Sequence, residues 1–326
     1  MDRKIALIIL GISALLAACA PPARPKIIQG ITMGTYYQII FYGDEPTDIK
    51  PQIDSLLKDF NHTFSVFDTA SMISSVNKSV SAVVNEDFCH VFNVSKQIYE
   101  VTGGAFDPTI EPLINLWGFG RDSARSVSDF EVDSLMRYLG FGKITLSNDT
   151  LYKENQYIVL NFNAIAKGFG VDKVAHFLKM KGYSDFVVEI GGEIVTNGTK
   201  AGKPWRVGIQ VPTEERDGAI ESEHSFVLDN AAVATSGNYR NYREENGVRY
   251  SHIINPKTGY PEKSDLLSVT VIASDCITAD ALATAFMVLG KDKSMQILEQ
   301  HPEWSAYFIC SKDGKFVNSK TANFPD

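Results

Sequence analysis

The sequence predicts a single α+β domain, and three observations lead to this fold class. Runs with strand-like alternation and runs with helix-like spacing of apolar residues follow one another along the whole chain. Hydrophobic residues make up 44% and charged residues 21% of the 326 positions, which is the composition of a globular protein with a core of normal size. After residue 30 there is no internal repeat, low-complexity tract or long linker at which a second domain would begin.

The N-terminus has the composition of an export signal. Arg3 and Lys4 precede an apolar run, Ile5–Leu16, that is too short to span a bilayer. The letters LAAC that end at Cys19 resemble a bacterial lipobox, whose cysteine becomes the lipidated first residue of the mature protein. A plain signal peptide with a chance cysteine is the alternative.

This N-terminus predicts three segments and a location. We expect a lipoprotein signal peptide over 1–18, a lipidated and proline-stiffened tether over 19–29, and the folded domain over 30–326. Several acyl chains on Cys19 would anchor the protein stably to a bacterial membrane. The domain is then expected to be exported and to face the periplasm.

Net charge and cysteine pattern each exclude a class of site. The net charge of −8 and the pI near 5.3 argue against a nucleic-acid partner, which needs a basic surface. Cys89, Cys276 and Cys310 have neither the number nor the spacing of a disulfide framework or a zinc site. We expect these three to be small buried apolar residues.

In the first half of the chain the elements follow in order. TYYQIIF alternates like a strand, and apolar residues share one face over 47–60, which predicts a helix. A second helix is predicted over 87–101. Ser128 followed by Glu131 has the pattern of a capping box and predicts a third helix from there.

In the second half, short strands alternate with two long helices. KITL, QYIVLNF, DFVVEI, RVGIQV, SFVLD and AAVAT are predicted strands, and a helix is predicted over 164–182. Asn246-Gly247 indicates a tight hairpin. LLSVTVIA is predicted as a buried strand, and the helix that follows it contains TADALATAFMVLG.

Two glycine-rich segments could be turns or could border a ligand. In TMGTYY, Gly34 suits a bulge in an edge strand, or a site. In TGGAFDPTIEPLINLWGFG, over residues 102–120, ordinary turn chemistry explains the glycines, but the aromatic and apolar residues would also suit a flat ligand.

Two further segments contain residues suited to catalysis. In NFNAIAKGFGVDK, Lys167 stands in the first turns of a predicted helix, where a positive charge disfavours the helix unless an anion binds there. In YSHIINPKTGYP, His252 is the side chain best suited to proton transfer near neutral pH. The alternatives are a solvated lysine and a hydrogen-bonded bystander histidine.

Asp280 and Thr284 lie four residues apart, so they project from one side of the last predicted helix. Their oxygens suit Mg²⁺, which is usually held by few protein groups together with substrate phosphates. The alternative is a helix-capping aspartate and a threonine that bonds back to the helix.

Taken in order, several long motifs resemble those of one known family. MGT, GAFDPTIEPLINLWGFG, AIAKGFGVD, EIGGE, TSGNY, SHIINPKTG and TADALATA resemble the successive motifs of the ApbE family of FAD:protein FMN transferases. The resemblance covers about residues 30–326. The lipobox before this region also matches, since many members are bacterial lipoproteins. It implies a T-fold-like core, and a Mg²⁺-dependent reaction that joins FMN from FAD to a Thr or Ser of an acceptor protein and releases AMP.

The resemblance also implies site residues. The expected FAD contacts are Met33, Phe67, Ala105, Phe106, Asp107, Asn161, Lys167, Ile254 and Ala283. The expected metal ligands are the backbone carbonyl of Ala164 and the side chains of Asp280 and Thr284. The sequence departs from the family at Asn161 and Asn255, where an acidic residue is usual. We add His252 as the catalytic base.

Two other functions compete with the transferase. A Mg²⁺-dependent FAD pyrophosphatase would use nearly the same site with water as the nucleophile, and a lipid-anchored FAD-binding protein would store the flavin without chemistry. The expected acceptor is a redox protein, for which the family suggests subunits of the sodium-pumping NADH:quinone reductase or of Rnf complexes.

Overall fold

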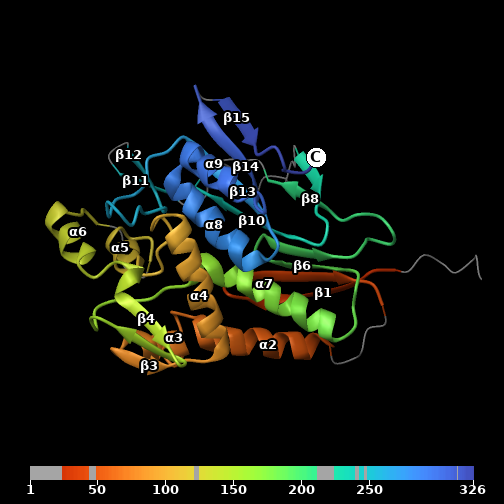
Figure 1. The fold of residues 1–326 in the computed structure, drawn as a ribbon, viewed down its shortest axis with the longest axis horizontal. Helices are drawn as coiled ribbons and strands as arrows, with labels where there is room; N and C mark the ends of the chain where they lie inside the picture. Colours follow the sequence, from red (N-terminus) through yellow and green to blue (C-terminus); the bar gives the residue numbers. More distant parts are fainter. Residues whose placement is uncertain are drawn as a thin grey trace, which may run out of the picture.

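An eight-stranded antiparallel sheet runs through the protein, with strand order β1-β2-β6-β7-β10-β13-β14-β15 (Figure 1). The computed structural model describes residues 24–43, 49–120, 125–210, 224–238, 242–245, 248–313 and 315–326. The strands of the sheet are β1 (Lys26–Thr32), β2 (Thr35–Phe41), β6 (Phe186–Ile190), β7 (Glu193–Asn197), β10 (Ala232–Gly237), β13 (Leu266–Ala273), β14 (Ser305–Lys312) and β15 (Lys315–Lys320).

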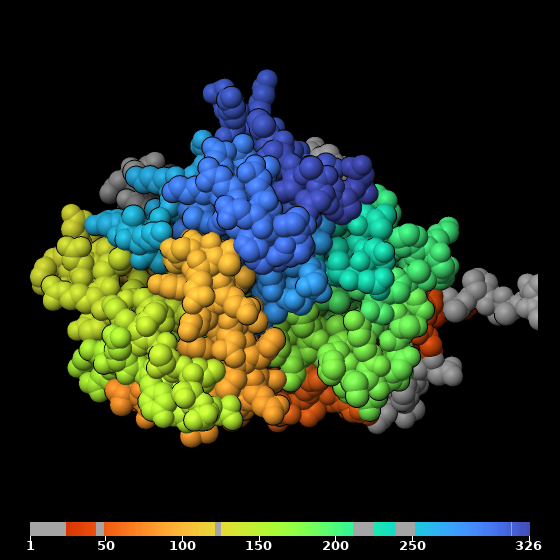
Figure 2. Space-filling model, in the orientation of Figure 1, coloured from red at the N-terminus to blue at the C-terminus, as the bar shows by residue number. Residues whose placement is uncertain are grey.

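Helices cover one face of this sheet. Strand residues alternate between faces, so that Ala232 and Ala234 of β10 point to the helices and Val233 points away. The α4 helix contacts α8, and on the surface its segment borders the blue C-terminal part of the chain (Figure 2). The covering helices are α2 (Ile49–Phe64), α4 (Glu86–Val101), α7 (Asn163–Met180), α8 (Cys276–Leu289) and α9 (Lys291–Gln300).

A small hairpin covers part of the other face. It consists of β8 (Arg206–Ile209) and β9 (His224–Val227), and it buries apolar side chains against the strands from β7 to β14. Phe226 packs on Phe324 near the C-terminus, with ring centroids 5.0 Å apart. This half of the sheet is therefore enclosed between helices and the hairpin.

The remaining elements form a lobe around residues 65–160 and the segment before β13. In Figure 1, α5, α6 and the sheet β3-β5-β4 lie on the left of the molecule, away from β8 and the C-terminus. These elements are α3 (Met72–Asn77), β3 (Ser81–Val83), α5 (Glu111–Leu116), α6 (Asp129–Met136), η1 (Phe141–Lys143), β4 (Ile144–Ser147), β5 (Thr150–Lys153), β11 (Tyr242–Glu245) and β12 (Val248–Ser251).

The α+β prediction is confirmed, as are the helices that begin near residues 49, 86, 129 and 163. The capping box of Ser128 and Glu131 is present at the start of α6. β11 and β12 pair as a hairpin, while its turn at Asn246-Gly247 lies outside the described residues.

One predicted strand, QYIVLNF over 156–162, is wrong. Side chains take the place of a partner strand here, because the Asn77 amide donates to the Leu160 carbonyl and accepts from its N–H, both at 2.8 Å. Lys153 Nζ donates to the Ile158 carbonyl at 2.9 Å. These side chains satisfy part of the segment's backbone, and the segment joins no sheet.

Two further expectations concern the N-terminal segments and the cysteines. The signal peptide and Cys19 lie outside the described residues, and β1 begins at Lys26, within the expected tether. Among the residues described, no helix has the length and apolarity to cross a membrane.

Cys276 is buried as expected, but the prediction is wrong for Cys89 and Cys310, which are partly exposed.

Candidate functional site

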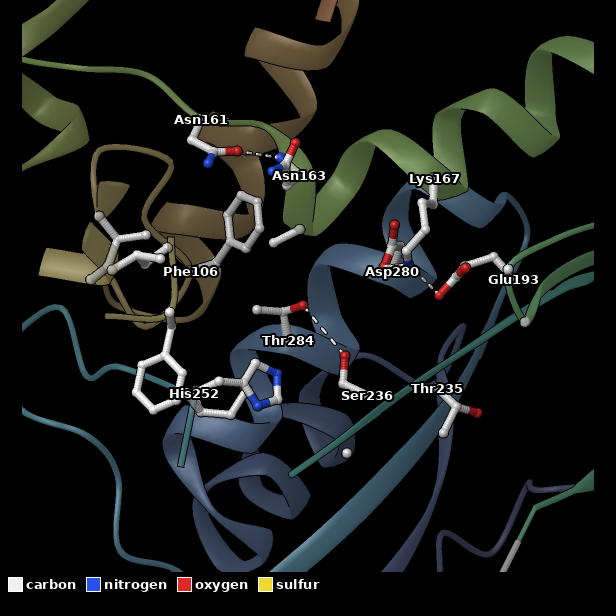
Figure 3. Close-up of a pocket in the computed structure, with 18 of the residues that line it drawn as sticks. Phe106, Asn161, Asn163, Lys167, Glu193, Thr235, Ser236, His252, Asp280 and Thr284 are labelled. Atoms are coloured by element: carbon white, nitrogen blue, oxygen red, sulfur yellow. Dashed lines mark hydrogen bonds and ion pairs between the residues drawn. The ribbon is translucent and has the colours of Figure 1, made fainter. Parts of the chain in front are cut away.

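A cavity of about 700 Å³ lies where α5, α7, α8, β10 and the turn between β6 and β7 meet. In Figure 3, Lys167, Asp280 and Glu193 lie together on one side, Phe106 and His252 on the other, and Thr284 between them. The cavity is thus charged at one end and aromatic at the other. Its lining includes the predicted residues Phe67, Ala105, Phe106, Asp107, Asn161, Ala164, Lys167, His252, Ile254, Asp280 and Thr284.

The charged end consists of one lysine between two carboxylates. Lys167 Nζ lies 2.6 Å from Glu193 Oε1 and 3.7 Å from Asp280 Oδ1. Both carboxylate side chains are nearly buried, whereas the lysine side chain is one-third exposed, at 33%. If all three groups are ionised, this end carries one net negative charge.

A close approach of two helices brings these groups together. Gly168 of α7 packs so tightly on α8 that a Cβ there would lie 2.2 Å from the Cys276 carbonyl oxygen. Its N–H donates to Asp280 Oδ2 at 2.9 Å. At the start of α8, Asp172 of α7 accepts from the N–H groups of Cys276 and Ile277 at 2.9 and 2.8 Å. The register between the helices is therefore fixed beside the site.

The pKa values at this end reflect burial and mutual charge. Burial lowers the pKa of Lys167, but the charges of Asp280 and Glu193 outweigh burial and raise it above its ordinary value. Burial raises the pKa of Glu193 from 4.5 to about 7, against the effect of Lys167. Glu193 Oε2 is buried without a hydrogen-bond partner. Lys167 therefore stays charged, and Glu193 titrates near neutral pH.

The structure argues against a helix-capping role for Asp280. The N-cap of α8 is Asp275, which accepts from the Thr278 N–H at 3.0 Å, so Asp280 is not a helix cap. The Thr284 hydroxyl lies 3.4 Å from the Ser236 hydroxyl on β10. Both side chains line the cavity, as a pair of ligands would.

The aromatic end combines flat side chains with His252. The rings of Phe119 and His252 meet edge to face with centroids 6.4 Å apart, and Ile254 lies beside them in the lining. Phe67 lines the cavity but is 73% exposed, which places its ring at the opening. A flat ring system is the ligand that such walls suit.

Asp107 and its neighbours hold the wall of the cavity in shape. Asp107 Oδ1 accepts from the Thr109 N–H at 2.8 Å and from its hydroxyl at 2.6 Å, closing an Asp-Pro-Thr turn. Burial raises the pKa of Asp107. The turn places Ala105 and Phe106 in the lining.

Asn161 is held by its neighbours inside the cavity. Its Oδ1 accepts from the Asn163 N–H at 2.7 Å, and its Nδ2 donates to Glu111 Oε2. Glu111 and Glu193 both line the cavity, and neither was predicted as a site residue. The EIGGE motif ends at Glu193, and the GAFDPTIEPLINLWGFG motif contains Glu111, so both residues stood in segments that the sequence had marked.

Two predicted FAD contacts do not line the cavity. Met33 and Gly34 form the β1–β2 turn with φ of 50° and 72°, and the Met33 side chain packs into the core against Gly170 of α7. Ala283 is fully buried in α8, one residue before Thr284. Neither side chain reaches the cavity, because both are packed into the protein core.

Among the described residues, no group of three or more His, Cys, Asp and Glu side chains could hold a metal ion. The expected magnesium ligands contain only one carboxylate, so they form a different kind of site. An incomplete set of this type is usual for Mg²⁺ when substrate phosphates complete its coordination.

Comparisons with known proteins point to one family. The ApbE family model matches residues 33–308. FAD:protein FMN transferases from Haemophilus influenzae and Vibrio cholerae are 36% and 38% identical, covering 99% and 98% of this chain and 98% and 97% of theirs.

Solved structures agree with this similarity. The flavin transferase ApbE from Vibrio cholerae superimposes with a TM-score of 0.84 at 34% identity, covering 93% of this chain and 99% of its own. The ApbE protein from Thermotoga maritima gives 0.81 at 27% identity, with 92% and 97% covered. The chain belongs to the ApbE family.

Proposed function

We propose that this protein transfers FMN from FAD to a Thr or Ser hydroxyl of an acceptor protein and releases AMP. The relatives that match nearly the whole chain have this activity in their names. The observation that carries the proposal is the cavity itself, in which a buried charged cluster lies beside aromatic walls. Such a site accommodates a pyrophosphate and flat rings in one ligand.

The charged cluster has a consequence for the metal. A pyrophosphate placed beside Lys167 would also face Asp280 and Glu193, and whenever both carboxylates are ionised the net negative charge there would repel it. A divalent cation reverses this balance. Mg²⁺ would be held by the Asp280 and Thr284 side chains and the Ala164 carbonyl, and when bound it would neutralise phosphate charge.

The Ala164 carbonyl suits this role because of the helix geometry. In a regular helix it would accept from the Gly168 N–H. That N–H also donates to Asp280 Oδ2 at 2.9 Å. This contact orients the carboxylate, and a carbonyl that shares its donor keeps acceptor capacity for a metal ion.

The protein residues divide the remaining work. The acceptor hydroxyl oxygen forms a bond to the phosphorus on the FMN side of the pyrophosphate. The bond from that phosphorus to the bridging oxygen breaks, and AMP leaves with the bridging oxygen. Lys167 neutralises phosphate charge, and His252 takes the hydroxyl proton. Phe106 and Phe67 orient the flat rings.

The FAD pyrophosphatase is the second candidate function, because the same groups would act if water replaced the acceptor hydroxyl. Storage of FAD without chemistry explains less, since a storage site has no use for a partly exposed lysine that faces a buried aspartate. Lipid anchoring at Cys19, an exported location facing the periplasm, and acceptors of the sodium-pumping NADH:quinone reductase or Rnf type belong to the proposal as well.

The test mixes the purified protein with FAD, Mg²⁺ and a threonine-containing candidate acceptor. Covalent flavin fluorescence on the acceptor in a denaturing gel, with AMP released, is the expected result. Free FMN and AMP formed at equal rates with and without acceptor would instead favour the pyrophosphatase. If the protein binds FAD but never cleaves it, storage of FAD would be the function that fits the result.

A further inference from the structure

Glu111 is a buried carboxylate in the cavity that the reaction above does not use. It stands at the start of α5, is 7% exposed and lines the cavity. Its Oε1 accepts from Asn115 Nδ2 at 3.3 Å, and its Oε2 accepts from Asn161 Nδ2. A carboxylate has about four acceptor positions, so these two bonds leave capacity for a donor from a ligand.

Asn161 presents a fixed donor beside this acceptor. Its Oδ1 accepts from the Asn163 N–H, so the amide cannot turn over without losing that bond and placing its oxygen against the Glu111 carboxylate. One Nδ2 hydrogen is donated to Glu111, and the second remains for a ligand. The pair therefore offers an acceptor and a donor side by side.

The amino edge of adenine is complementary to this pair. Its 6-amino group donates and the neighbouring ring nitrogen accepts, whereas hypoxanthine and guanine have an oxygen acceptor in place of the amino group. Ile110, Ile114 and the ring of Phe119 add apolar surface to the lining of the same cavity. We propose that Glu111, oriented by its two amide neighbours, is a specificity-determining residue that accepts the adenine 6-amino group of FAD. This inference rests on the proposed function.

The depth of Glu111 assigns it to the adenine rather than to the flavin ring. The FMN half must reach the acceptor hydroxyl and leaves attached to another protein, so it belongs at the open end. Phe67, which is 73% exposed, provides a ring face there. The half that departs as free AMP takes the buried end, where an oxygen facing a carboxylate would be poorly tolerated.

The test measures binding in EDTA, which prevents turnover, by titration of flavin fluorescence. The ligands are FAD and flavin hypoxanthine dinucleotide, which carries an oxygen in place of the 6-amino group. We expect the wild-type protein to bind FAD about 10- to 100-fold more tightly. Glu111→Gln, whose amide donates to an oxygen, should shift this ratio towards the hypoxanthine ligand by at least about tenfold.

Two controls keep the result interpretable. Glu100→Gln removes the same charge from an exposed position on α4 and should leave the ratio unchanged. A third ligand, 3-methyl-FAD, blocks the only N–H of the flavin ring edge, and its affinity relative to FAD should be the same for the wild-type protein and Glu111→Gln. The melting temperature of each variant verifies that it is folded. The preference of the wild-type protein for FAD is measured on that protein alone, so it does not depend on the folding of any variant.

Three results would overturn the inference. The first is equal affinity of the wild-type protein for FAD and the hypoxanthine dinucleotide, and the second is an unchanged ratio of these affinities in Glu111→Gln. The third is a loss of affinity on 3-methylation of FAD that occurs in the wild-type protein but not in Glu111→Gln, which would place Glu111 at the flavin. A different result would contradict the proposed function. In that case the wild-type protein would discriminate between the two bases in EDTA but would transfer no FMN when Mg²⁺ and acceptor are added.

Discussion

Gly168→Ala tests whether the contact between α7 and α8 positions the charged cluster. A Cβ at this position would lie 2.2 Å from the Cys276 carbonyl oxygen and 2.8 Å from Asp280 Cβ. Ordinary contacts begin at 3.4 Å, so the two helices must separate by about 1 Å. The bond from the Gly168 N–H to Asp280 Oδ2 would lengthen with them.

The expected magnitude combines two opposing effects on stability. Overpacking costs about 1–3 kcal/mol, while alanine in a helix interior recovers up to about 1 kcal/mol relative to glycine. We expect a net loss of about 1–2 kcal/mol in the free energy of unfolding. A displacement of about 1 Å at Asp280 should in addition slow FMN transfer about 10²-fold.

The assays are urea denaturation and the rate of FMN transfer at saturating FAD and Mg²⁺. Gly142→Ala is the matched control, because a Cβ there meets no atom within 4 Å and its φ is not positive. That variant should retain the wild-type stability and rate. Wild-type stability together with a transfer rate within about twofold of wild type in Gly168→Ala would refute the role of this contact.

Four further predictions follow from the site and the N-terminus. Asp280→Ala should lose Mg²⁺-dependent transfer while circular dichroism reports an intact fold, and full activity at low Mg²⁺ would rule out its role as a ligand. His252→Ala should slow transfer by about 10²–10⁴ with little change in FAD affinity, and an unchanged rate would remove it from the mechanism. Because the folded-state pKa of Glu193 is raised to about 7, its contribution to stability falls as pH rises from about 4.5 to about 7. The free energy of unfolding of Glu193→Gln relative to that of wild type, measured by urea denaturation in EDTA, should therefore be higher at pH 8 than at pH 5. A difference between the two proteins that does not change with pH would contradict this. Cys19→Ala should leave the membrane fraction or remain unprocessed, and incorporation of labelled fatty acid into this variant would disprove lipidation at Cys19.

The parts of the site that the sequence predicts are local in the chain. Helical spacing marked Asp280 and Thr284 as a candidate pair, the family resemblance implied that they bind metal, and the structure places both in the cavity. Lys167 was predicted from its place at the start of a helix. Its partner Glu193 follows a full helix and a strand later, and no spacing rule joins two residues so far apart.

The same limit explains the wrong strand over 156–162. Its apolar residues match a strand, but what replaces the sheet is the side chain of Asn77, about eighty residues earlier in the chain. Glu111 is similar, because its amide partner Asn161 comes from a distant segment. Hydrogen bonds between distant segments thus explain both the site residue that was not predicted, Glu111, and the strand over 156–162 that was predicted wrongly.

The most direct test of the proposed function is the intact mass of an acceptor protein after incubation with this protein, FAD and Mg²⁺. A transferase predicts a mass increase equal to FMN less one water, located on a Thr or Ser, with one AMP released for each modified acceptor. Substitution of that residue by alanine should abolish the increase. An unmodified acceptor accompanied by stoichiometric free FMN and AMP would contradict the transferase and identify the protein as an FAD pyrophosphatase.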